Sequence, residues 1–289
     1  MGWKYCPEGA GNVPENEKVR ENMRVLIKGA GDLATGIGCR LHRCGFDVVM
    51  TDIAVPTTVR RTVAFSRAVY EGEVLVEDVT GVLCHNLEEA EEALKKDWVA
   101  VLVDETCKIR ESLKPDAVVD AIIAKENLGT KITDAPIVVG VGPGFTAGLD
   151  CHAAVETKRG HDLGRCIWNG SPVPNTGVPG NIGGYDKERI IRAEADGLFK
   201  GAVKIGDMVE KGDLVGYSGG VPIYAQVGGV VRGLLQDGVS VITGMKSGDV
   251  DPRGVIDNCF TISDKASAIG GGVIEAILSL KKKKERKEK

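Results

Sequence analysis

The sequence predicts an α/β protein in two parts, a parallel sheet flanked by helices and then a small all-β barrel. The first part is predicted by a strand–glycine turn–helix–strand pattern over residues 24–52 and by later apolar runs of strand length. The second is predicted by short apolar pairs between Gly-Asp and Lys-Gly turns over residues 195–253. The 289 residues are enough for two domains, and 43% apolar content is enough for a core.

Residues 24–52 have the pattern of a Rossmann-like unit that binds a dinucleotide. An apolar run is followed by glycines and an alanine at G-x-G-x-x-A spacing, which gives a tight turn, a close approach for phosphate and close helix packing. An acid at the end of the second strand can reach a ribose hydroxyl. A carboxylate inside the turn leaves a second interpretation, a fold of this class whose turn binds no dinucleotide. The residues in question are Gly29, Gly31, Asp32, Ala34 and Asp52.

The next elements follow in order. Pro56 predicts a helix entry, and Arg60 and Arg61 near its start either pair with a phosphate or with Asp52, or lie on a solvated face. Asp104 ends a predicted strand, so it lies on the ligand side of a parallel sheet or caps the next helix. The predicted strands are residues 74–79, 82–84, 98–104, 117–123 and 136–141, with an amphipathic helix over 87–96.

A second glycine-rich turn, residues 142–148, precedes a Cys-His pair. Gly142 and Gly144 either complete a cofactor or anion cradle or belong to a flexible turn. Cys151 and His152 are the predicted catalytic residues, because a histidine can activate a thiolate. Against this, neighbours in a strand point to opposite faces, and cysteine is commonly a small buried residue. No metal site is predicted, since the eight cysteines form no Cys-x-x-Cys pair.

Composition changes along the chain predict the domain boundaries. The barrel resembles a biotinyl/lipoyl-type barrel-sandwich hybrid, although its hairpin 218–222 lacks the lysine that carriers modify. The predicted layout is a disordered leader (1–22), a Rossmann-like domain (23–157), a Gly/Pro-rich connection (158–190), the β barrel (191–253), a C-terminal segment with a helix over 273–280 that packs back on the first domain (254–280) and a charged tail (281–289).

Charge and composition exclude some classes of partner. The formal net charge is −4, and residues 281–289 hold seven basic and two acidic residues, so the rest of the chain is near −9. With only 4% aromatic residues, this predicts no nucleic-acid surface. No apolar run approaches the roughly 20 residues of a membrane helix. Scattered cysteines favour a reducing, cytoplasmic location.

Five segments of the chain form a distinctive set: GAGDLATGIGCRLHRCGF, VVDAIIAKENLGTKITDAP, GPGFTAGLDCHAAVETKRGHDLGR, GDVDPRG and FTISDKASAIGGGVIEAIL. Together they resemble the YqeB-type accessory proteins of selenium-dependent molybdenum hydroxylases, and the Rossmann part is similar in kind to XdhC-like chaperones. The resemblance implies a cytoplasmic maturation factor whose partner is such a hydroxylase. The expected ligand of the crevice is NAD(P), another nucleotide or a molybdopterin-type cofactor, and a homodimer is a possible assembly.

The alternative is an NAD(P)-dependent oxidoreductase that acts on a small metabolite. Against it, no Ser/Tyr/Lys cluster of a hydride-transfer enzyme can be assigned in the sequence. The sequence leaves open whether the protein is an enzyme.

Overall fold

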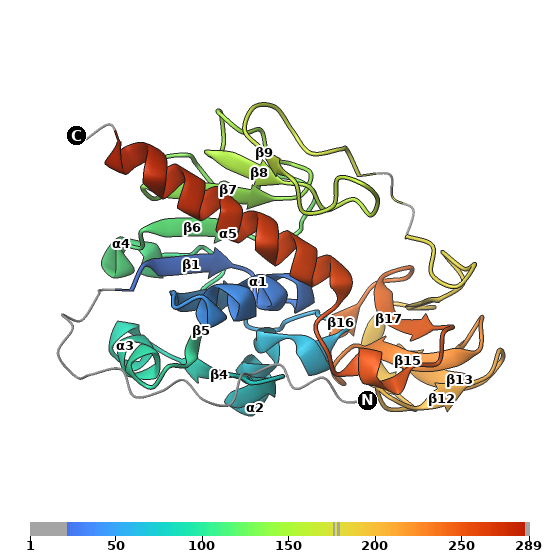
Figure 1. Ribbon diagram of the computed structural model, residues 1–289. Helices are drawn as coiled ribbons and strands as arrows, with labels where there is room; N and C mark the ends of the chain where they lie inside the picture. Colours follow the sequence, from blue (N-terminus) through green and yellow to red (C-terminus); the bar gives the residue numbers. More distant parts are fainter. Residues whose placement is uncertain (1–21, 176, 178–179, 287–289) are drawn as a thin grey trace, which may run out of the picture.

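The structure is a computed structural model that describes residues 22–175, 177 and 180–286. The predicted leader, apart from Asn22, and the last three residues of the predicted tail lie outside the described residues. Within these ranges the chain forms one large sheet and two smaller sheets, and a long C-terminal helix lies across the large one (Figure 1). No helix in the described ranges combines the length and apolar character needed to cross a bilayer.

A nine-stranded mixed sheet forms the larger part of the molecule, in the order β3-β4-β5-β2-β1-β6-β7-β8-β9. The strands from β4 to β8 run parallel to their neighbours, whereas β3 and β9 pair antiparallel at the two borders. The strands are β1 (Arg24–Lys28), β2 (Asp47–Asp52), β3 (Glu73–Val76), β4 (Val79–Cys84), β5 (Val99–Val103), β6 (Ala117–Asp120), β7 (Ile137–Val141), β8 (Ala153–Val155) and β9 (Cys166–Ile167).

The strand–turn–helix–strand unit predicted over residues 24–52 is present as β1, α1 (Asp32–Arg43) and β2. Successive side chains of a strand point to opposite faces, so β1 and β2 contribute to two cores. Leu26 and Val49 pack on the face covered by α3 (Leu87–Lys95) and α4 (Ile109–Leu113). The residues next to them along both strands pack on the face covered by α1 and α5.

Helix α5 (Asp264–Glu285) runs diagonally across the large sheet beside α1 (Figure 1). Ser263 caps its N-terminus by accepting a hydrogen bond from the Ala266 N–H at 3.1 Å. The helix therefore begins before the predicted range of 273–280 and contains the glycine run. Glycine is needed where this helix crosses the backbone at Gly164, because a Cβ added at Gly272 would lie 2.0 Å from the Gly164 carbonyl oxygen.

Two four-stranded antiparallel sheets, β10-β17-β15-β12 and β14-β13-β11-β16, enclose a third core. The Leu234 N–H donates to the Val59 carbonyl at 2.7 Å, and Arg61 Nε donates to the Leu234 carbonyl at 3.0 Å, so these sheets are fixed to the segment after β2. The strands are β10 (Ile190–Arg192), β11 (Gly197–Gly201), β12 (Met208–Val209), β13 (Leu214–Ser218), β14 (Val221–Tyr224), β15 (Gly229–Leu234), β16 (Ser240–Val241) and β17 (Lys246–Asp251).

The predicted fold class, a Rossmann-like parallel sheet with a barrel-sandwich-hybrid-like barrel, is wrong. The large sheet is mixed, because Glu77 and Asp78 form a two-residue turn between β3 and β4 and so tight a turn joins only antiparallel strands. The later residues form two separate antiparallel sheets, with register shifts in the β10–β17, β13–β14 and β15–β17 pairs. The result is a mixed α/β protein with one large mixed sheet and two antiparallel sheets.

The helix predicted after Pro56 is also wrong. The segment instead forms two short 3-10 turns and a four-residue helix, because its backbone binds the glycine turn and α1. The Phe65 N–H donates to Thr35 Oγ1 and the Ser66 N–H to the Ala30 carbonyl, both at 2.8 Å. The predicted domain boundaries stay a prediction. The short helices are η1 (Arg61–Val63), η2 (Phe65–Arg67), α2 (Ala68–Glu71) and η3 (Ile256–Cys259).

Candidate functional site

The carboxyl ends of β1, β2, β5 and β6 open into a cavity of about 800 Å³, here called the sheet-edge crevice. Ligand sites of α/β sheets commonly lie outside the carboxyl ends of the strands. The crevice brings together five of the seven predicted cofactor-binding residues: Gly29, Gly31, Asp32, Ala34 and Asp52. The other two, Gly142 and Gly144, do not line it, so the second glycine turn is not the other half of this cavity.

Asp52 holds the glycine turn in place. Its Oδ2 accepts the Ala30 N–H at 2.9 Å and its Oδ1 accepts the Ile53 N–H at 2.8 Å. Burial raises the pKa of the Asp52 carboxyl above its ordinary value. Gly29 has φ +95°, and an added Cβ would lie 3.0 Å from the Ala121 carbonyl oxygen, so only glycine fits where the turn passes β6.

A buried lysine lies on the wall of the same crevice. Lys28 Nζ donates to Thr130 Oγ1 at 2.6 Å and lies 3.2 Å from Asp120 Oδ2, while the Thr130 hydroxyl donates to the same carboxylate at 2.5 Å. An ammonium has three N–H donors. These two partners therefore leave one donor of Lys28 for a group inside the crevice. The sequence signal that could have identified Asp120 is its place at the end of a predicted strand.

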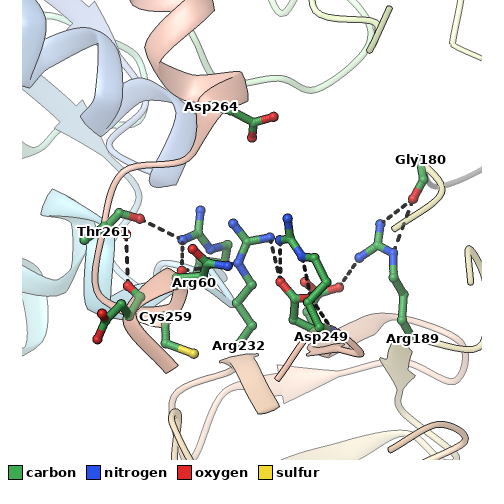
Figure 2. Close-up of polar contacts among 12 residues, drawn as sticks. Arg60, Gly180, Arg189, Arg232, Asp249, Cys259, Thr261 and Asp264 are labelled. Atoms are coloured by element: carbon green, nitrogen blue, oxygen red, sulfur yellow. Dashed lines mark hydrogen bonds and ion pairs between the residues drawn. The ribbon is translucent and has the colours of Figure 1, made fainter. Parts of the chain in front are cut away.

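A second cavity, of about 420 Å³, lies between the first turn of α1, the start of α5 and the antiparallel sheets, and it is here called the basic pocket. Figure 2 shows the guanidinium groups of Arg60, Arg232 and Arg189 in a row, with Asp264 at the start of α5 above them. Among the residues that the structure describes, two acidic ones, Asp32 and Asp249, line this cavity. The basic residues that line it are Arg60, Lys158, Arg159, Arg189, Arg232, Lys246 and Lys265.

Arg60 joins the two parts of the molecule inside the basic pocket. It is only 6% exposed, and its Nη2 donates to the carbonyls of Asn258 at 3.0 Å and Thr261 at 3.1 Å. Its Nη1 lies 3.3 Å from Asp32 Oδ2. Its buried Nε has no hydrogen-bond partner among the described residues. The side chain is therefore held in place while its bonding capacity is only partly used.

Arg232 is also 6% exposed and is held more weakly. Its Nε donates to the Asn258 carbonyl at 3.3 Å, and its Nη1 lies 3.7 Å from Asp251 Oδ2. Burial lowers the pKa of this guanidinium, and the positive charge of Arg60 lowers it further. Two nearly buried arginines therefore meet at the Asn258 carbonyl, and each has one carboxylate, Asp32 or Asp251, as its ion-pair partner.

The remaining cations have different partners. Arg189, 8% exposed, is bound to Asp249 and to the Gly180 carbonyl, and Arg159 forms two hydrogen bonds with Asp264 at 2.7 and 3.1 Å. Within the described part of the chain, Lys265 forms no ion pair. Burial lowers the pKa of the Lys265 ammonium, and the charge of Arg159 lowers it further. Lys265 therefore carries its positive charge at a cost that a bound anion would offset.

Sequence reasoning found only one member of this arginine cluster. Arg60 was expected to meet a phosphate or Asp52, and it lines the basic pocket but pairs with Asp32. Arg61, its neighbour, instead binds the Leu234 carbonyl. Arg232 lies in β15, and Arg189 directly precedes β10 of the same antiparallel sheet. No periodic signal in the sequence places either of them beside Arg60.

Cys151 and His152 line neither cavity, so their predicted catalytic role stays a prediction. Cys151 is fully buried, and burial raises the pKa of its thiol to about 11. The His152 Nδ1 accepts the Val138 N–H at 3.0 Å, which ties the ring to β7. Burial lowers the pKa of this imidazole, and the charge of Lys284 lowers it further.

The rate of alkylation shows whether the Cys151 thiol is reactive or inert. With iodoacetamide near pH 8, we expect the exposed Cys44 to react at least roughly 100-fold faster than Cys151, because the thiolate is the nucleophile and burial suppresses it. Mass spectrometry of peptides over time gives both rates in one sample. Similar rates would contradict the burial argument and would restore Cys151 as a candidate nucleophile.

Comparison with known proteins gives one strong match in sequence. The chain is 50% identical over 256 residues to "Uncharacterized protein YqeB" of Escherichia coli (strain K12). The match covers 89% of this chain but 47% of that protein, so the chain spans about half the length of the curated relative it matches. No protein-family model matches the chain.

Solved structures match only loosely. An aspartoacylase family protein from Mesorhizobium loti has a TM-score of 0.25 at 12% identity, over 80% of this chain and 85% of the other. The ectoine utilization protein EutE (DoeB) from Ruegeria pomeroyi, in its product-bound structure, has a TM-score of 0.24 at 14% identity, over 79% and 85%. A succinylglutamate desuccinylase from Silicibacter has a TM-score of 0.24 at 14% identity, over 79% and 84%. Scores this low carry no functional inference for this chain.

These comparisons correct the assignment made from the sequence. The matched relative is named as uncharacterized, and the solved structures are named as aspartoacylase, desuccinylase and ectoine utilization proteins. None of these names denotes an XdhC-like protein, a maturation factor of a molybdenum hydroxylase or an NAD(P)-dependent oxidoreductase. The predicted accessory role, its selenium-dependent hydroxylase partner, the Rossmann nucleotide-binding assignment and the oxidoreductase alternative are therefore wrong.

Proposed function

We propose that the protein binds a small, multiply charged anion in the basic pocket. The observation that carries this proposal is the set of three arginines, Arg60, Arg189 and Arg232, each at least nine-tenths buried and facing one cavity. Buried charges are normally paired one to one with opposite charges. Among the described residues, seven basic and two acidic side chains line this cavity. Each of the three arginines has one carboxylate partner, Asp32, Asp249 or Asp251, whereas Lys158 and Lys265 form no ion pair in the described part of the chain.

Guanidinium groups suit oxyanions because their N–H donors form a planar fork that matches carboxylate and phosphate oxygens. Among the described residues, the Nη groups of Arg232 form no hydrogen bond and the Nζ of Lys265 forms no ion pair, so both can donate to an anion. Placing an anion between them would replace the repulsion among the cations with attraction, in a partly desolvated site where such attraction is strong. The bound species would therefore be a phosphate- or sulfate-like group.

Calorimetric titration with inorganic phosphate at low ionic strength tests this proposal. We expect one site per chain and an affinity that falls as sodium chloride is added, because salt screens the charges. A phosphate concentration of about 100 times the dissociation constant should also stabilise the fold by about 2.7 kcal/mol. If neither heat of binding nor a shift in melting temperature is seen, the protein is not an anion-binding protein of this kind.

A second test measures how anion binding depends on pH, with the same calorimetric titration. Sulfate is the probe, because its charge is constant over the pH range of the measurement. The lowered pKa of Lys265 means that its proton is lost below the ordinary lysine value of about 10.4. Binding should therefore weaken as the pH rises through that pKa, and Lys265→Met should remove this step. The other charged groups near Lys265 are Arg159, Asp32, Glu156 and Asp264.

A cytoplasmic location is also part of the proposal. The seven cysteines in the described ranges are all free, which suits a reducing compartment better than an oxidising one. Fractionation of cells that express the full chain checks this location.

A further inference from the structure

The two cavities adjoin each other. Asp32 and Leu33, in the first turn of α1, line both of them. The Asp32 carboxylate lies 3.3 Å from the Arg60 guanidinium, so the border is marked by an ion pair whose cation belongs to the basic pocket. A molecule bound in one cavity can therefore continue past α1 into the other.

The charges of the two cavities differ in sign. Five acidic residues line the sheet-edge crevice, against three basic ones. Lys28 is bound by Asp120 and Thr130, and Arg110 forms an ion pair with Asp134, so two of the three cations already have partners. The acidic residues of the crevice are Asp32, Asp52, Asp104, Glu105 and Asp134.

Carboxylates are acceptors, so the crevice favours a group that donates hydrogen bonds and disfavours a second anion. Asp104 keeps acceptor capacity, since its oxygens bind only the Ile109 N–H at 2.8 Å and the Thr106 hydroxyl at 3.4 Å among the described residues. An ionised carboxylate has about four acceptor sites. Hydroxyl groups are uncharged donors that fit this requirement.

Part of the lining is apolar and open to solvent. Ile53, Ile122 and Leu128 are 36%, 38% and 55% exposed and line the crevice together with Leu33. Such a surface covers the carbon skeleton of a ligand, while the carboxylates bind its polar edge. The volume of about 800 Å³ is in the range of small-molecule sites.

We propose that the ligand is a single molecule with two unlike ends, an anionic group that binds in the basic pocket and an uncharged, hydroxyl-bearing body that binds in the sheet-edge crevice. This inference rests on the proposed function, because the basic pocket must first bind the anion. It adds the chemical class of the rest of the ligand. A phosphate ester of a polyol has this chemistry.

Affinities for three probes test the inference: inorganic phosphate, a hexitol monophosphate and phosphoglycerate. We expect the hexitol ester to bind at least tenfold more tightly than phosphate, because its hydroxyls reach the carboxylates of the crevice. Phosphoglycerate, whose body carries a carboxylate, should gain nothing over phosphate. The readout is the ratio of each ester's affinity to that of phosphate for the same protein sample.

Variants show whether the gain comes from the crevice. Ile122→Trp and, independently, Leu128→Trp place an indole in the crevice from two partly exposed positions, and each should reduce the hexitol-to-phosphate ratio to below about threefold. Leu149→Trp is the matched control, since Leu149 is 71% exposed and lines neither cavity, and it should keep the wild-type ratio.

The outcomes separate the two proposals. If phosphate does not bind to the wild-type protein, the proposed function fails, and this inference fails with it. If phosphate binds but the hexitol ester binds no more tightly, or phosphoglycerate binds equally well, the anion site stands and the two-ended ligand is overturned. A ratio that both tryptophan variants leave unchanged would place the body of the ligand outside the crevice and would also overturn it.

Discussion

Replacing Arg232 with methionine is expected to weaken phosphate binding by roughly 10- to 100-fold, while the protein stays folded. A hydrogen bond to a charged group contributes about 1.5–3 kcal/mol, which corresponds to this range. The fold should survive for two reasons. Asp251 keeps Arg253 as a partner at 2.6 Å, and removal of one buried cation relieves the repulsion from Arg60.

Arg253→Met is the matched control for this experiment. It removes the other arginine that binds the Asp251 carboxylate, but Arg253 does not line the basic pocket. We expect the affinity for phosphate to change by less than about threefold, because solvent ions screen the charge of an arginine that does not line the pocket. Calorimetry on both variants measures the difference. Equal losses would show that only the overall positive field matters, and equal affinities would show that the anion does not contact Arg232.

The largest expected effect on stability comes from two adjacent glycines of α5. Gly272→Ala should lower the free energy of unfolding by about 3 kcal/mol, because the added Cβ would lie 2.0 Å from the Gly164 carbonyl oxygen and 3.0 Å from Val155 Cγ1. Gly271→Ala should raise it by about 0.5–1 kcal/mol, because nothing lies within 4 Å of the added Cβ and alanine favours the helix.

Urea unfolding monitored by circular dichroism measures both changes on the same helix. The opposite signs are the decisive result, since helix propensity alone would stabilise both variants equally. If Gly272→Ala is as stable as the wild type, the close crossing of α5 over Gly164 is not present in solution. A gain for Gly272→Ala would also contradict the packing described for this helix.

The local part of the fold could be predicted from the sequence. Apolar runs and the glycine spacing placed β1, α1 and β2. The position of an acid after the second strand pointed to Asp52, and the rule for carboxyl ends of parallel strands pointed to Asp104. The fold class could not be obtained in this way. The direction of β3 depends on a turn of two residues between β3 and β4. This turn lies inside the apolar run over residues 74–79, which the sequence pattern predicts as a single strand.

The basic pocket was beyond sequence reasoning for a different reason. A lone arginine has the same local signature on a solvated surface as in a buried cluster, and only tertiary contacts bring Arg60, Arg189 and Arg232 to one cavity. The same limit explains the helix predicted after Pro56. Local spacing favoured a helix there, but the hydrogen bonds from that segment to Thr35 and Ala30 impose another conformation.

The contacts of Arg60 also bear on how the chain folds. Its guanidinium binds carbonyls 198 and 201 residues further along the sequence. Contacts of such high sequence separation form slowly, because the entropy of closing the intervening loop is lost before the contact stabilises anything. During synthesis, a nascent chain that ends before Asn258 holds Arg60 without these two acceptors. Phosphate affinity should therefore appear only when nearly the whole chain has folded, which makes anion binding a reporter of complete folding rather than of any one part.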